Sequence, residues 1–173
     1  MDPRYPIGKF SWTASNTSNQ RAGLIKNIAV TPQRLRKAVE ELTEQQLDTP
    51  YREDGWTVRQ VVHHLPDSHL NSYVRFKLAL TEHEPTIKAY DEAKWAELID
   101  GKNAPIEPSL QLLDGLHRRW VMLLLSLSGE DVQRKFVHPE LGVVSIDQYI
   151  SVYAWHGKHH VAHITALREK EGW

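Results

Sequence analysis

Four long stretches of this 173-residue chain repeat apolar residues at every third, fourth or seventh position, which is the spacing of one face of an α-helix. The stretches begin near Leu24, Thr57, Leu112 and Ser145. A capping-box pattern, Ser or Thr followed three residues later by Gln, opens the second and the fourth stretch. Another copy, Thr43–Gln46, predicts one short helical turn. Because each amphipathic helix must bury its apolar face against another, the pattern predicts an all-α four-helix bundle.

The segments between these helices are rich in residues that interrupt helices. Residues 1–21 carry Pro, Gly and a Ser/Thr/Asn-rich run, so we expect an extended N-terminal arm. Residues 82–108 are charged and contain several breakers, which predicts a long crossover between the second and third helices, with a short helix near 91–98. Phe136–His138 and Val143–Val144 flank a turn at Pro139–Gly142 and predict a small β-hairpin before the last helix.

Two prolines fall inside predicted helices. Pro32 either kinks the first helix or lies in the first turn of a separate one capped by Thr31. Pro66 removes a backbone donor and crowds the carbonyl of Val62, so we expect the second helix to bend there.

Composition restricts the classes of function. The length and the 40% hydrophobic content fit one globular domain, residues 1–173. A net charge of −1 gives no overall field that would attract nucleic acid, and no apolar run is long enough for a signal peptide or a membrane span. We therefore expect a cytoplasmic protein that binds neither nucleic acid nor membrane. Because the chain has no cysteine, a metal must be held mainly by His, Asp or Glu.

Four of the ten histidines lie in the segment "HGKHHVAH" of the last helix, residues 156–163. Side chains at i and i+4 lie one above the other on a helix, so His156/His160 and His159/His163 both have the spacing to bind one cation. The segment "VVHHLPDSH" of the second helix can supply a further ligand from either His63 or His64. The helical wheels leave both choices open.

Asp67 shares the flank of His64 at i+3 and is a candidate ligand, supporting partner or catalytic base. The alternative for Asp67 is a capping or surface carboxylate, and the alternative for the histidine cluster is a polar helix face. His83, His117 and His138 are expected to be ordinary solvated or hydrogen-bonded side chains. Tyr73 is expected to be a core residue or to line a pocket.

Three segments resemble the YfiT-like branch of the DinB superfamily, the bacterial metal-dependent hydrolases: "YPIG" at residues 5–8, the stretch from Gln46 to Glu82, and "YAWHGKHHVAHITAL" at residues 153–167. The resemblance covers nearly the whole chain. It implies a four-helix bundle, a homodimer, and one divalent ion per subunit, zinc or nickel, held by three histidines.

Transferred residue by residue, the resemblance implies His64, His159 and His163 as the metal ligands. His156 and His160 then line the pocket or support the ligands. Pro66 stands where the family segment has alanine, and we expect the site to survive with altered geometry.

Three functions follow from an ion held by three histidines. The first is hydrolysis by water that the ion activates, with Asp67 or a histidine moving protons. The second, from resemblance to other members of the superfamily, is transfer of a low-molecular-weight thiol such as bacillithiol to an electrophile, with the thiol as cosubstrate. The third is a non-enzymatic metal-binding or sensor protein, which would favour a site closed by four protein ligands.

Overall fold

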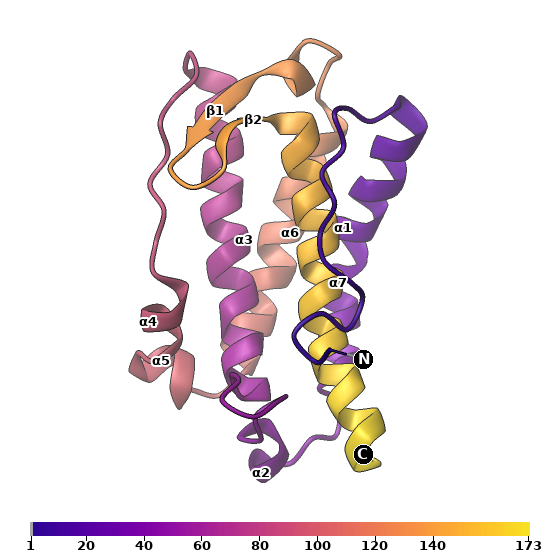
Figure 1. The fold of residues 1–173 in the computed structure, drawn as a ribbon, viewed down its shortest axis with the longest axis vertical. Helices are drawn as coiled ribbons and strands as arrows, with labels where there is room; N and C mark the ends of the chain where they lie inside the picture. The colour runs from indigo at the N-terminus through magenta and orange to yellow at the C-terminus, as the bar shows by residue number, and fades with distance from the viewer. Residues whose placement is uncertain (1) are drawn as a thin grey trace.

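The computed structural model describes residues 2–173 and forms a bundle of four long helices (Figure 1). The long helices are α1 (Ser18–Ala38), α3 (Val58–Thr81), α6 (Glu107–Leu125) and α7 (Ile146–Glu171). The shorter elements are α2 (Glu44–Leu47), α4 (Glu92–Ala96), α5 (Ile99–Lys102), the 3₁₀ helix η1 (Asp131–Gln133) and the hairpin strands β1 (Lys135–His138) and β2 (Gly142–Ser145). The predicted bundle, its long crossover and its hairpin before the last helix are confirmed.

Capping boxes begin several of the helices. At Thr43, Thr57 and Ser145 the hydroxyl accepts a hydrogen bond from the backbone of the third helical residue, and the Gln side chain there accepts one from the cap. These three boxes were predicted. A fourth capping box, at Thr17 and Gln20, was not predicted. It starts α1 at Ser18, so the N-terminal arm ends earlier than expected.

Both internal prolines lie within continuous helices. α1 runs through Pro32 as a single helix, so the alternative of a separate helix starting there is wrong. α3 likewise continues through Pro66 from Val58 to Thr81. Two boundaries differ from the prediction. α6 ends at Leu125, before the expected stop at Gly129. In the hairpin, His138 pairs with Gly142, so the turn is one residue shorter than predicted.

The packing order of the helices brings the two histidine segments together. α1 packs against α6 and α7, and α3 packs against the same two helices, so the consecutive helices α1 and α3 lie diagonally in the bundle. α3 therefore lies beside α7 (Figure 1). His64 in the segment "VVHHL" of α3 therefore faces His156 and His160 in the segment "HGKHH" of α7.

A polar layer divides the apolar core. One buried cluster, at the hairpin end, includes Phe76, Trp120 and Ile150, and another, near α2, includes Val61 and Ile164. Between them along the helices lie the partly buried His156 and the buried polar residues His64, Ser68, His69, Ser72, His117 and His160. No helix within residues 2–173 is both long and apolar enough to cross a membrane.

Two contacts set the position of α7. Gly157 lies against Thr31 of α1, where an added Cβ would be only 2.7 Å from the threonine Oγ1. The buried carboxylate of Asp147 pairs with Arg21 (2.6 Å) and accepts from the backbone N–H of Asn16 (2.6 Å). The glycine thus allows a close helix contact beside His156, and the carboxylate holds the end of the N-terminal arm.

Candidate metal centre

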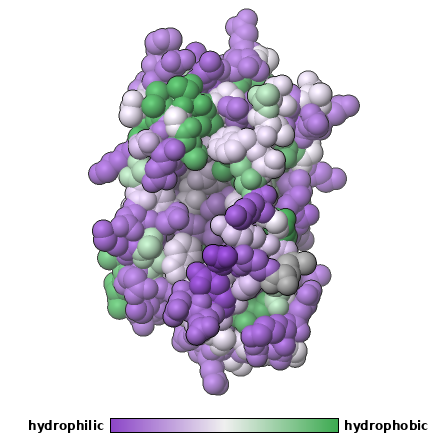
Figure 2. Space-filling view, in the orientation of Figure 1, coloured by the Kyte–Doolittle hydropathy of each residue, from purple (hydrophilic) through white to green (hydrophobic). Residues whose placement is uncertain are grey.

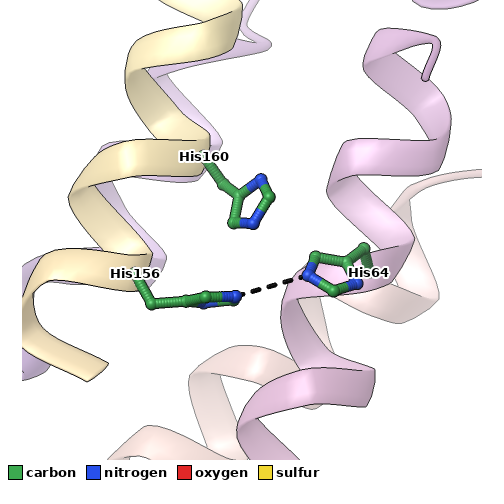
Figure 3. A group of neighbouring side chains, drawn as sticks. All are labelled: His64, His156 and His160. Atoms are coloured by element: carbon green, nitrogen blue, oxygen red, sulfur yellow. Dashed lines mark hydrogen bonds between the residues drawn. The ribbon is translucent and has the colours of Figure 1, made fainter. Parts of the chain in front are cut away.

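Three histidines from two helices converge in the polar layer. His64 comes from α3, and His156 and His160 lie one turn apart on α7. Each offers a ring nitrogen, and these nitrogens lie within 4.8 Å of one another. The Nε2 atoms of His64 and His156 are 3.4 Å apart, and the ring of His160 points toward the other two (Figure 3). The arrangement has the form of a three-imidazole metal site.

The distances and the environment of the three rings fit a divalent ion. Two ligands on a tetrahedral ion with metal–nitrogen bonds of about 2.0–2.1 Å lie about 3.3–3.4 Å apart, as these two Nε2 atoms do. Burial lowers the pKa of His64 to about 3 and the pKa values of His156 and His160 well below their ordinary value. The rings are therefore neutral, the form that binds metals, and imidazole suits zinc, nickel, copper and iron.

A chain of hydrogen bonds connects His156 to a backbone carbonyl across the bundle. The Nδ1 of His117 lies 2.7 Å from the carbonyl oxygen of Ile28. The Nε2 of His117 lies 2.8 Å from the Nδ1 of His69, and the Nε2 of His69 lies 3.1 Å from the Nδ1 of His156. We name this chain, from Ile28 through His117 and His69 to His156, the histidine relay.

The carbonyl at its end fixes the direction of the histidine relay. A carbonyl only accepts, so the Nδ1–H of His117 donates to Ile28. Burial lowers the pKa of His117 to about 4 and that of His69 well below its ordinary value, so both rings are neutral and each has one N–H. His69 therefore donates to His117, and His156 donates to His69. This leaves the lone pair of His156 on Nε2, the atom that faces His64.

Sequence reasoning gave no role to His69 or His117. The available signal was the position of His117 on α6, where it interrupts an apolar face formed by Leu113, Leu116 and Trp120. A buried polar ring there needs partners on both nitrogens. Its partners come from α1 and α3, and the sequence of α6 alone does not identify them.

His159 and His163 contact a different part of the molecule. The Nε2–H of His163 donates to the carbonyl of Arg4 in the N-terminal arm (3.3 Å), and its ring stacks on Tyr51 at 4.1 Å. The ring of His159 stacks on Trp155 at 4.2 Å. Neither belongs to the group of ligand atoms around His64.

The structure thus brings His64 together with the pair His156/His160. The predicted ligand set of His64, His159 and His163 is not the set that converges. The wheel could not decide between the pairs because the two lie about 60° apart on one helix, and the rotation of α7 decides which of them faces α3.

The remaining sequence candidates lie outside this cluster. His63 has both ring nitrogens in use, with Ser109 Oγ at 2.7 Å and the carbonyl of Ala104 at 3.1 Å. Asp67 is half-buried, and burial followed by the charge of Asp100 raises its pKa to about 6. It lines neither of the cavities beside the cluster, and its catalytic role stays a prediction. Tyr73 also lies outside both, with its ring against Lys77 and Arg119.

Two cavities meet at His156. The larger, of about 620 Å³, is lined by Ser68, Arg75, Tyr149 and Tyr153 among others. The smaller, of about 480 Å³, has walls from the arm, Tyr51, Trp56 and the histidines of α7. His156 and the exposed Glu92 line both. Figure 2 shows this side of the molecule as a mainly hydrophilic surface with a recess near its middle. A small molecule can therefore approach the cluster from solvent.

Comparison with known families identifies the class of the protein. The DinB superfamily matches residues 27–164, which include the three converging histidines. The chain belongs to this superfamily, in its YfiT-like branch.

Individual relatives agree over the whole chain. Proteins of Bacillus cereus strain B4264 and Bacillus mycoides strain KBAB4, both named "Putative metal-dependent hydrolase", are 55% and 54% identical over 99% of this chain and 99% of their own. The structure of YfiT from Bacillus subtilis, described as a probable metal-dependent hydrolase with an unusual four-helix bundle topology, is 47% identical with a TM-score of 0.97 and covers 100% of this chain and 99% of that one. The four-helix bundle protein TT2238 has the same fold at 20% identity, with a TM-score of 0.59 over 84% of this chain and 98% of its own.

Proposed function

We propose that this protein is a metal-dependent hydrolase of small molecules, with one zinc or nickel ion per subunit bound by His64, His156 and His160. The observation that carries the proposal is the convergence of three neutral imidazoles, two of them buried and that of His156 partly buried, where two cavities meet. The names of the relatives support the same chemistry. Three protein ligands leave at least one coordination position open, which is typical of catalytic rather than structural sites.

The chemistry that such an ion supplies is Lewis-acid activation of water and polarisation of an ester, amide or phosphoryl oxygen. The protein supplies the three ligands and fixes their orientation. The histidine relay orients His156, and Trp56 packs against the ring of His64, with 4.7 Å between the ring centroids.

Two hydroxyls extend the site into the larger cavity. The Oγ of Ser68 lies 3.5 Å from the Nε2 of His156 and 3.2 Å from the Oη of Tyr153. Both side chains line the cavity wall. The hydroxyl of Tyr153 donates to the carbonyl oxygen of Ser68 (3.2 Å), so the hydroxyl of Ser68 is the one that can donate a hydrogen bond to an oxygen of the substrate.

Metal analysis of purified protein, followed by an ester and amide panel with and without an added thiol, tests the proposal. We expect turnover without thiol that is lost on chelation and restored by zinc or nickel. His64→Ala should abolish both metal binding and turnover. His83→Ala, which removes an exposed histidine just after the end of α3, should change neither. A strict requirement for a thiol would favour thiol transfer instead. Metal binding without turnover of either kind would favour a non-enzymatic protein.

Homodimerisation also remains a proposal, and it is tested independently by sedimentation of the purified protein. A mass of one chain at micromolar concentration would contradict it.

A further inference from the structure

Arg75 on α3 is a buried cation without a carboxylate partner. Only 6% of its surface is exposed, and it forms no salt bridge with any Asp or Glu among residues 2–173. Its Nη1 donates to the hydroxyl of Tyr149 (2.7 Å) and its Nη2 donates to the carbonyl of Lys88 (3.1 Å). Burying a charge without a counter-ion is costly, so an unpaired buried guanidinium needs an explanation.

The unused donors of Arg75 open into the larger cavity. A guanidinium has five N–H groups, and the two hydrogen bonds above leave the others without a partner in the described part of the chain. None of its nitrogens is among the fully buried polar atoms that lack a partner. Arg75 lines the 620 Å³ cavity, together with His156 of the candidate metal centre. An anion in this cavity can therefore reach the guanidinium, and His156 brings the candidate metal centre to the same cavity.

We propose that Arg75 binds the carboxylate of the substrate, so that the enzyme acts on small organic monocarboxylates. The hydrolysis of such a substrate rests on the proposed function, whereas the binding of its carboxylate by Arg75 does not. A guanidinium presents paired N–H groups that match the two oxygens of a carboxylate, and the small exposure of Arg75 to water strengthens the contact.

The other residues of the cavity favour a monoanion over a phosphate. Asp91, Glu92 and Glu140 lie exposed on its lining, and they would repel a dianion more strongly than a single carboxylate. Tyr90 and Leu141 add aromatic and apolar surface for an organic stem.

The spacing along α7 limits the length of that stem. Tyr149, which contacts Arg75, and His156 are seven residues apart on the same helix, a rise of about 10 Å. The carboxylate and the bond to be hydrolysed should therefore be separated by a stem of about this length.

Calorimetric titration with phenylbutyrate and its neutral amide, phenylbutyramide, tests the carboxylate site without requiring turnover. On metal-stripped wild-type protein we expect the carboxylate to bind about tenfold more tightly than the amide. Arg75→Met should remove this preference, and Arg75→Lys should retain part of it because lysine keeps the charge and loses the paired donors. Arg118→Met, which removes an exposed arginine of α6, should leave the preference unchanged.

Equal affinity of stripped wild type for the two probes would overturn the proposal, whether or not the variants fold. So would a carboxylate preference that appears only after zinc is added, because the probe would then be binding the ion. If Arg75→Met is unstable by circular dichroism, the comparison of wild type with Arg75→Lys decides instead, and an unchanged preference there would contradict paired-donor recognition. Failure of the hydrolase assay would leave the binding result intact.

Discussion

The last helix carries two histidine pairs with the same spacing and different environments. His156 and His160 face α3 within the polar layer, and the Nδ1 of His156 is held by His69, which leaves its Nε2 free to bind. His159 and His163 face the N-terminal arm, where His163 donates its Nε2–H to Arg4 and both rings stack on aromatic side chains. The i, i+4 spacing is therefore permissive, and the surroundings that each pair faces decide whether its ring nitrogens can share one ion.

Breaking the histidine relay should have the largest effect on the difference between the two pairs, and the quantity affected is the affinity for metal. His69→Phe removes the acceptor of the His156 Nδ1–H and leaves His117 unpaired on Nε2. Losing such a supporting partner typically weakens metal binding about 10–100-fold, and we expect a loss in that range by competition with a chelator. His163→Phe removes a histidine whose ring centroid lies 5.3 Å from that of His160 but which donates to Arg4 and holds no proposed ligand, so the affinity should fall by less than about tenfold. Equal losses in both variants would refute the distinction.

The close contact between α1 and α7 provides a second way to disturb the pairs. Gly157→Ala places a Cβ against Thr31, a short buried side chain that cannot move away easily. We expect a loss of about 1–3 kcal/mol in the free energy of unfolding, measured by urea denaturation. Thr31→Ala should restore most of this loss.

Gly115→Ala is the matched control, because Gly115 lies in α6 with open space where its Cβ would be. This change should be neutral or stabilise by up to about 1 kcal/mol through helix propensity. A Gly157→Ala variant as stable as this control would show that the helix contact does not constrain α7.

Asp67 tests the smaller question of whether the carboxylate beside His64 belongs to the site. Its pKa is raised to about 6, so the folded state binds this proton more tightly than the unfolded state. The resulting stabilisation is complete below the unfolded pKa, near 3.8, and is lost as pH rises through about 6. Asp67→Asn should therefore raise the melting temperature at pH 8, by about 2–4 °C if partial exposure reduces the effect to about 1 kcal/mol, and change it little at pH 4.

Retention of turnover in Asp67→Asn at pH 8 would mean that Asp67 is a half-buried structural carboxyl and not the catalytic base. Loss of turnover with unchanged metal content would support the catalytic role that the sequence suggested.

The sequence was sufficient for the fold because its local signals agree. Capping boxes at Thr57 and Ser145 mark the starts of the two helices that carry the histidines, and the apolar periods continue behind them. The box at Thr17 follows the same rule, and the Ser/Thr/Asn-rich run around it masked the signal.

The ligand set was less predictable because it depends on tertiary arrangement. The choice between the pairs depends on how far α7 is rotated, and contacts such as Gly157 with Thr31 set that rotation. The histidine relay adds a carbonyl from α1 and a ring from α6, which no local pattern connects. Arg75 likewise has an ordinary sequence context, and only its burial without a carboxylate partner in the described part of the chain distinguishes it.

Metal content of two double variants tests the central claim most directly. His156→Ala/His160→Ala and His159→Ala/His163→Ala each remove one i, i+4 pair from the same helix and leave His64 in place. Elemental analysis of proteins purified in parallel should find no bound zinc or nickel in the first variant and about one ion per subunit in the second. The opposite result, metal retained in the first variant and lost in the second, would contradict the account and support His64, His159 and His163 as the ligands.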